Sequence, residues 1–229
     1  MDTIHFLRRL ELKFKNVVYY VIMILPMIVT VVMLNHLPER IPTHYGFSNQ
    51  ADRWGSKYEL LAFPILVILF GILMRLLRNH HNKNQGGKNE MVCEVSGIVG
   101  MITFSIMDYY FIYLGSINAA NTTFFPIELD EILFGLLGLS LIVIGCILPK
   151  TEKNAVTGLS TRWSLKNDLT WRKSQIVGGV SFVISGISIV LSGQCSNGVR
   201  SLIMTGIVFA LLLLVDVTST YFIALKNNG

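Results

Sequence analysis

Ionisable side chains that could do chemistry gather in a polar segment, residues 34–60, between two long apolar runs. His36, His44 and Asp52 all lie in this segment. An imidazole beside a carboxylate can act as a general base or contribute to a metal site. The two histidines are eight residues apart across two prolines, which is not a recognised metal-binding spacing. We therefore expect a structural hydrogen bond here, and neither a catalytic nor a metal-binding role.

Two more ionisable groups lie inside apolar runs: Asp108 in "SIMDYYFIYL" and Asp216 in "LLLLVDVTSTY". A carboxyl group at membrane depth is costly and is a functional candidate by default. We expect each to be hydrogen-bonded and to join helices, without pairing directly with the other; a proton path is the alternative. The expected partners are Tyr109, Tyr110 and Tyr113 for Asp108, and Thr218, Ser219 and Thr220 for Asp216.

The other reactive residue types do not form a catalytic pattern. The chain has no H-E-x-x-H and no G-x-S-x-G motif. Its three cysteines, Cys93, Cys146 and Cys195, are far apart and form no C-x-x-C. His80 and His81 lie in a hydrophilic linker, where solvated side chains are expected. The sequence therefore predicts no catalytic residue, no metal and no cofactor, and a protein that is not an enzyme.

The elements that must position these groups are apolar runs. Of the 229 residues, 52% are hydrophobic and 14% are charged, whereas about a quarter of a soluble domain is charged. A run of about 20 apolar residues spans a bilayer as a helix. The first run has no cleavage site after it, so we expect it to be retained. The fold class predicted is all-α, a polytopic membrane protein with six transmembrane helices near 17–35, 58–77, 94–115, 129–149, 175–193 and 199–225.

The lysines and arginines predict how these helices are oriented. Fifteen of the 19 fall at the two termini or in the second and fourth loops, with Arg75 and Arg78 counted in the second loop. Because such residues stay in the cytoplasm, both termini are expected to be cytoplasmic. The 34–60 segment then faces outward and the 150–174 loop faces inward. The net charge of +5 mostly expresses this bias, and it indicates membrane lipids rather than direct nucleic-acid binding.

Small residues and prolines add local expectations. Gly135, Gly138 and Gly145 in the fourth run, and Gly179, Gly186 and Gly193 in the fifth, favour close helix packing in lipid. In the outer segment, prolines hold the chain extended and Gly46 permits a turn. That segment should therefore be an ordered extracellular cap.

The 150–174 loop should lead into a helix. Asn167 or Ser164 is a suitable N-cap, and Asp168 would then lie in the first turn. Trp171 is expected in the headgroup zone beside Arg172 and Lys173, as are the other tryptophans, Trp54 and Trp163. Lys166, Arg172 and Lys173 could hold lipid phosphates or contact an acidic protein surface.

Two sets of residues resemble known families. The loop resembles the signature of the SdpI family of bacterial membrane immunity proteins, and the outer segment resembles an uncharacterised extracellular module that often precedes it. The loop residues are Asn154, Gly158, Thr161, Trp163, Leu165, Lys166, Asn167, Trp171, Arg172, Lys173, Gly178 and Gly179. The outer residues are Leu37, Pro38, Ile41, Pro42, His44, Gly46, Asp52, Trp54, Ser56 and Lys57.

The chain also departs from the family pattern. It has Ser160-Thr161-Arg162-Trp163 where an Arg-Thr-Pro-Trp stretch is usual, and Gln175 where a histidine is usual. The resemblance suggests two units. An N-terminal membrane module, residues 1–93, would carry the Pro/His segment 35–57. A four-helix SdpI-like module, residues 94–229, would carry the cytoplasmic signature loop.

The resemblance implies that the protein lies in the bacterial plasma membrane. There it would protect the producing cell from a secreted antimicrobial peptide. The resemblance also implies signalling, in which a cytosolic winged-helix autorepressor is captured at the membrane. The toxin-facing residues would be Pro42, His44, Gly46, Asp52 and Trp54. The docking residues for repressor or lipid would be Asn154, Gly158, Trp163, Lys166, Asn167, Trp171 and Arg172. A small proton-coupled transporter or exporter using Asp108 and Asp216, and a membrane hydrolase that degrades the peptide, are the alternatives.

Overall fold

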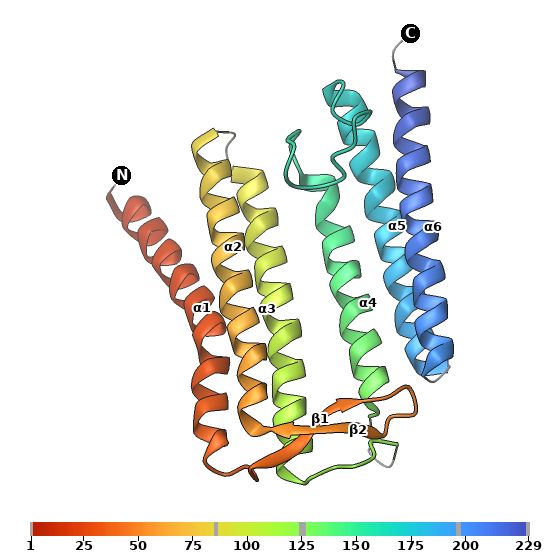
Figure 1. The fold of residues 1–229 in the computed structure, drawn as a ribbon. Helices are drawn as coiled ribbons and strands as arrows, with labels where there is room; N and C mark the ends of the chain where they lie inside the picture. Colours follow the sequence, from red (N-terminus) through yellow and green to blue (C-terminus); the bar gives the residue numbers. More distant parts are fainter. Residues whose placement is uncertain (1, 85–86, 124–126, 196–197, 228–229) are drawn as a thin grey trace.

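Six long helices make up most of the protein (Figure 1). The computed structural model describes residues 2–84, 87–123, 127–195 and 198–227. The helices are α1 (Asp2–Leu34), α2 (Ala62–Asn84), α3 (Gly87–Ser116), α4 (Leu129–Ile147), α5 (Asp168–Cys195) and α6 (Val199–Lys226). All six are long and apolar enough to cross a membrane. The prediction of six apolar helices that could cross a membrane is confirmed.

The expectation of an all-α fold is wrong for the polar segment of residues 34–60. Strand β1 (Arg40–Tyr45) pairs antiparallel with β2 (Ala51–Ser56), and Pro42 faces Trp54 in the register. The pairing is irregular between Pro42 and Tyr45, as expected where a proline cannot donate to the ladder. A short 3-10 helix, η1 (Lys57–Leu61), then leads into α2.

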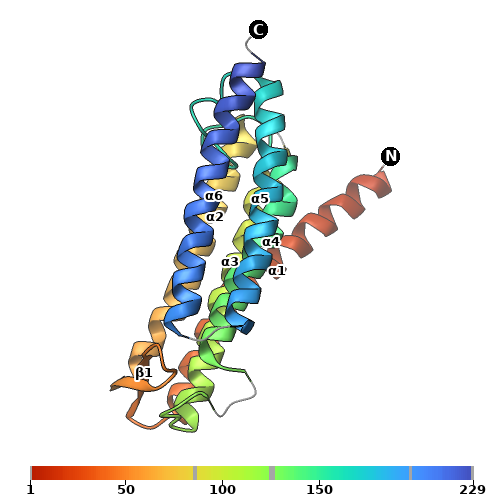
Figure 2. The same cartoon turned by 90° about the vertical axis from the view of Figure 1, so that its right-hand side faces the viewer.

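The helices gather into two groups of three, α1–α3 and α4–α6 (Figure 1). Both chain ends lie at one end of the bundle, which we call the terminus face. The strands lie at the opposite end, the hairpin face, below both groups. Figure 2 shows the N-terminal half of α1 leaning away from the other helices.

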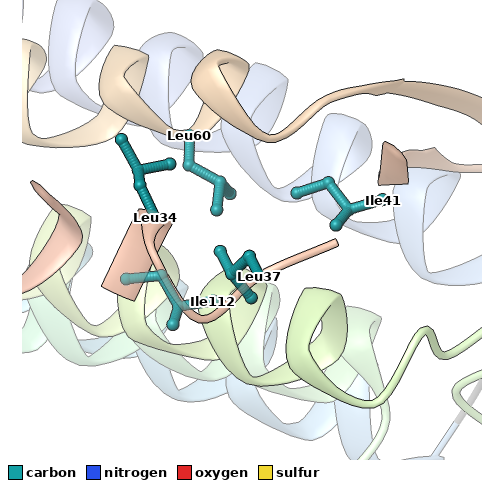
Figure 3. Packing of buried hydrophobic residues seen from close by; sticks show 5 residues of the cluster. All are labelled: Leu34, Leu37, Ile41, Leu60 and Ile112. Atoms are coloured by element: carbon teal, nitrogen blue, oxygen red, sulfur yellow. The ribbon is translucent and has the colours of Figure 1, made fainter. Parts of the chain in front are cut away.

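The hairpin is fixed to the first group by an apolar cluster. Leu37 and Ile41 pack with Leu34 at the end of α1, Leu60 in η1 and Ile112 in α3 (Figure 3). Ile41 is fully buried. Burying a side chain of this size stabilises a fold by about 1.5–3 kcal/mol, so the hairpin is a docked cap rather than a free loop.

The second group contains the close helix contact that the glycines predicted. A Cβ atom on Gly186 would lie 2.5 Å from the carbonyl oxygen of Gly138, and one on Gly145 would lie 2.7 Å from that of Gly179. The backbones of α4 and α5 therefore touch at two levels, which requires residues without side chains. Gly135 has no neighbour within 4 Å of such a Cβ, so it is not part of this contact.

Two arginines counted with the second loop belong to a helix, because α2 continues to Asn84. Arg78 lies with its Nε 3.8 Å from carboxylates of both Glu90 and Glu94 on α3. The guanidinium of Arg75 lies 5.2 Å from the ring centre of Tyr19 on α1. These contacts let the C-terminal part of α2 carry charge while it packs against α1 and α3.

Candidate functional site

The hairpin brings His44 and Asp52 together, as the sequence predicted. The Nδ1 of His44 lies 2.6 Å from Oδ1 of Asp52, close enough for the ring N–H to donate to the carboxylate. Both side chains are more than half exposed. A pair this exposed contributes little to stability, and it adds a polar, hydrogen-bonded group to the surface of the hairpin.

The other three residues of the predicted toxin-facing set have different positions. Trp54 is 40% exposed on β2, whereas Pro42 on β1 is buried. Gly46 lies at the turn, where an added Cβ would be 3.1 Å from Oδ2 of Asp52. His44, Asp52 and Trp54 are therefore the members that a molecule outside can touch, while Pro42 and Gly46 shape the segment.

The tip of the hairpin is held by Asn49, a residue that the sequence reasoning missed. Asn49 is buried and has a left-handed backbone, φ 56°. Its Nδ2 donates to Oε2 of Glu128 at 2.6 Å and to Oδ1 of Asp130 at 2.9 Å. The other oxygen of Asp130 accepts from the backbone N–H of Gly198 at 3.0 Å. One amide and one carboxylate thus join the hairpin to the start of α4 and to the turn between α5 and α6.

Neighbouring contacts reinforce this junction. The hydroxyl of Tyr45 donates to the carbonyl of Ala119 at 2.7 Å. Burial raises the pKa of the Tyr45 phenol, so it remains a donor at neutral pH. The amide of Ala51 donates to the carbonyl of Ala120 at 2.8 Å. The α3–α4 connection therefore lies along the edge of β2 and ties the hairpin to both helix groups.

On the terminus face, the loop between α4 and α5 is ordered by its own side chains. The Oδ1 of Asn154 accepts from the amides of Val156 and Thr157 at 2.8 and 2.6 Å, and its Nδ2 donates to the carbonyl of Glu152 at 2.7 Å. Gly158 has a φ of +84°, and an added Cβ would lie 2.6 Å from Oε1 of Gln175. Asn154 and Gly158 thus act inside the loop, as scaffold.

Gln175 joins this loop to α5 through its side-chain amide. It is fully buried on α5. Its Oε1 accepts from the amide of Leu159 at 2.8 Å, and its Nε2 donates to the carbonyl of the same residue at 3.2 Å. A side-chain amide can satisfy both backbone groups of one residue. This position therefore fixes the loop to α5.

The start of α5 confirms one predicted N-cap. Asn167 Oδ1 accepts from the amide of Thr170 at 2.8 Å, and the helix begins at Asp168. The alternative, Ser164, instead shares reciprocal hydrogen bonds with Thr161, at 2.9 and 3.0 Å, in the turn before it. Both residues order the chain where backbone groups lack helical partners.

Trp171 is packed inside the protein, which its position beside two basic residues did not indicate. Trp171 is 3% exposed, and its Nε1 donates to the carbonyl of Thr151 at 3.0 Å. A buried indole with its N–H satisfied is a packing residue. Trp163 lies edge-on to Tyr221 of α6, with ring centres 5.5 Å apart. Lys166 and Arg172 are exposed, so they are the predicted docking residues that a partner could reach.

Asn89 makes a second contact that the sequence reasoning missed. It is fully buried near the start of α3. Its Oδ1 accepts from the amide of Glu152 at 2.9 Å, and its Nδ2 donates to the carbonyl of Glu152 at 3.2 Å. The two helix groups are therefore linked at the terminus face, as Asn49 links them at the hairpin face. An asparagine early in an apolar helix was the available signal.

The membrane-embedded aspartates join helices, as expected, but through unexpected partners. Asp108 is fully buried, and its Oδ2 lies 2.7 Å from the hydroxyl of Thr30 on α1. Asp216 is buried, and its Oδ1 lies 2.5 Å from the hydroxyl of Ser181 on α5. The partners proposed from nearby tyrosines and threonines are thus replaced by hydroxyls on other helices. The two aspartates do not pair with each other.

Both aspartates share one hydrogen-bond arrangement. The hydroxyl of Thr30 also lies 2.8 Å from the carbonyl of Pro26, and that of Ser181 lies 2.9 Å from the carbonyl of Gly178. A hydroxyl has one proton to donate. Each can therefore serve its backbone carbonyl and its carboxyl group together only when the carboxyl group supplies a proton. The other carboxyl oxygen of Asp108, Oδ1, is buried and has no hydrogen-bond partner among the described residues.

No group of three or more His, Cys, Asp or Glu side chains that could hold a metal ion occurs among the described residues. His81 has no described side chain. Among the described residues, no third His, Cys, Asp or Glu side chain joins the pair of His44 and Asp52 to complete a metal site.

Comparisons with known proteins support the two resemblances in the predicted order. Residues 150–224 match the SdpI/YfhL protein family, and residues 21–68 match a domain of unknown function, DUF1648. The chain is 21% identical over 215 residues to the immunity protein SdpI of Bacillus subtilis strain 168. That alignment covers 94% of this chain and 98% of the relative. No solved structure matches the chain.

Proposed function

We propose that this protein protects the cell that makes it from a secreted killing peptide. One observation carries the proposal: the likeness to the immunity protein SdpI extends over nearly the whole length of both chains. The six apolar helices place such a protein in the cell membrane, where a secreted peptide would meet it. The proposal does not include an enzymatic step.

The proposal orients the hairpin face toward the outside and the terminus face toward the cytoplasm. The distribution of lysines and arginines supports this orientation, since 15 of the 19 belong to the termini and the loops on the terminus face or to the helix ends beside them. A peptide arriving from outside would then meet the hairpin first. Labelling single cysteines placed at Phe47 and at Lys166 with a membrane-impermeant reagent tests it, in a cysteine-free background. If the reagent labels position 166 in intact cells and does not label position 47, the orientation is the opposite of the proposed one.

The toxin-facing surface in this proposal consists of His44, Asp52 and Trp54, the exposed part of the hairpin. The docked core beneath them gives the surface a fixed shape. We expect His44→Ala and Trp54→Ala to reduce the peptide concentration that cells survive, while membrane abundance stays at the wild-type level. Lys166→Gln on the opposite face is the control and should protect fully. If both hairpin variants protect fully, the toxin does not depend on this surface for recognition.

A signalling role would use the opposite face. The loop of residues 151–167 is held rigid by Asn154 and Gln175, and it presents Arg162 and Lys166 outward. A rigid basic surface suits capture of an acidic face of a cytosolic repressor. We expect Arg162→Glu with Lys166→Glu to abolish co-purification of a winged-helix protein that wild type retains. Equal recovery with the charge-reversed protein would refute this role.

A further inference from the structure

A hollow lies at the terminus face, between the ends of three helices. It has a volume of about 880 Å³. Lys88 and Met91 line it from the first five residues of α3, and Trp171 and Arg172 line it from the first five of α5. Lys150 lines it from a position three residues beyond the end of α4. All three contributing spans end at the hollow, which places it at the depth of lipid headgroups.

The lining combines positive charge with apolar surface. Lys88 is paired with Glu152 at 3.1 Å, and Lys153 is paired with Asp168 at 2.7 Å. Lys150 and Arg172 have no ion-pair or hydrogen-bond partner among residues 2–84, 87–123, 127–195 and 198–227, and both are exposed. Two positive charges therefore remain uncompensated at the hollow.

The apolar part of the lining comes from Met91, Pro149 and Trp171. Its walls are fixed in place. Trp171 is held through its hydrogen bond to Thr151, and the 151–153 segment is held by the buried amide of Asn89. A preformed site loses less conformational freedom when it binds a ligand.

We propose that this hollow binds the phosphodiester headgroup of an anionic phospholipid. Lys150 and Arg172 would contact the phosphate, for which the guanidinium offers two parallel N–H donors. Met91 and Pro149, which are exposed, would contact the glycerol and the first carbons of the acyl chains. Basic pockets between helix ends on the positively charged face of a membrane protein bind such headgroups. The depth of the hollow and its apolar lining favour a lipid over a soluble protein.

Native mass spectrometry of the purified full-length protein in detergent tests this site. The probe is palmitoyl-oleoyl-phosphatidylglycerol, compared with the matching phosphatidylcholine. We expect wild type to retain phosphatidylglycerol in preference to phosphatidylcholine. Lys150→Gln with Arg172→Gln should raise the half-saturating concentration of phosphatidylglycerol about tenfold. Lys13→Gln with Lys226→Gln removes the same charge from the same face outside the hollow, and should bind like wild type.

Several results would overturn the site. Equal retention of the two lipids, or equal loss in both double variants, would show that binding is not specific to this hollow. Displacement of phosphatidylglycerol by an excess of inorganic phosphate would indicate a site for free anions. If the hollow variant keeps its lipid but loses a cytosolic protein partner, the hollow is a protein-docking surface. Because binding is measured on purified protein, each result is independent of protection against the peptide.

Discussion

Asn49→Ala should release the tip of the hairpin from the second helix group. The substitution removes the side-chain amide that donates to Glu128 at 2.6 Å and to Asp130 at 2.9 Å. It also leaves two carboxylates close together without the donor that they share. The apolar cluster around Ile41 remains, so the hairpin stays docked on the first group. The perturbation is therefore local to the junction between the groups.

The magnitude follows from the number of charged hydrogen bonds lost. A hydrogen bond to a charged group contributes about 1.5–3 kcal/mol. Two such bonds from one buried amide, each taken at the low end, contribute about 3 kcal/mol. This corresponds to a change of roughly a hundredfold in the ratio of attached to released hairpin tip.

Hydrogen exchange followed by mass spectrometry measures this ratio directly. The amides of Ala51 and Thr122 donate across the junction, to Ala120 and to Asn49, and their exchange should accelerate by about the same factor. Asn118→Ala is the matched control. Asn118 also has a left-handed backbone, φ 52°, but is exposed. Asn118→Ala places an alanine in the same left-handed backbone conformation as Asn49→Ala does, but it removes no hydrogen bond to a carboxylate.

Equal acceleration in the two variants would refute the reasoning. It would mean that the left-handed backbone, and not the amide bonds to Glu128 and Asp130, fixes the tip. Unchanged exchange in Asn49→Ala would show that the junction is held by other contacts.

Three further substitutions test the packing at other levels. Asp108→Asn keeps a side-chain donor and should leave thermal stability and protection near wild type; loss of protection at normal abundance would favour proton exchange and the transporter alternative. Gly186→Leu places a Cβ atom 2.5 Å from a backbone oxygen of α4. It should lower the free energy of unfolding by about 3 kcal/mol in a thermal melt, whereas Gly135→Leu should leave it unchanged. Trp171→Ala removes a buried indole and should destabilise the fold by about 3–5 kcal/mol, while Lys166→Gln should leave the melting temperature unchanged.

The features predictable from sequence were those set by local composition. Apolar runs indicated the six helices, because length and hydropathy decide whether a segment can span a bilayer. Asn167 was recognisable as an N-cap, because its partner lies three residues away. The glycines at 138 and 186 indicated close packing because only a bare backbone allows such an approach.

Features that depend on distant partners were not predictable. The strands at 40–45 and 51–56 are six residues each, without a clear alternation of polar and apolar side chains, and their pairing depends on docking against α1 and α3. Thr30 is 78 residues from Asp108, so nearer hydroxyls looked equally suitable. The burial of Trp171 was not predictable either, because it depends on the loop folding back so that the carbonyl of Thr151, 20 residues away, accepts from the indole N–H.

Survival of a sensitive bacterium that expresses this protein tests the central claim most directly. Cells with and without the protein are exposed to a dilution series of the killing peptide purified from the producing strain, and membrane abundance is verified by immunoblot. The account predicts survival at peptide concentrations that kill cells lacking the protein. Identical killing curves, with the protein present in the membrane, would contradict it.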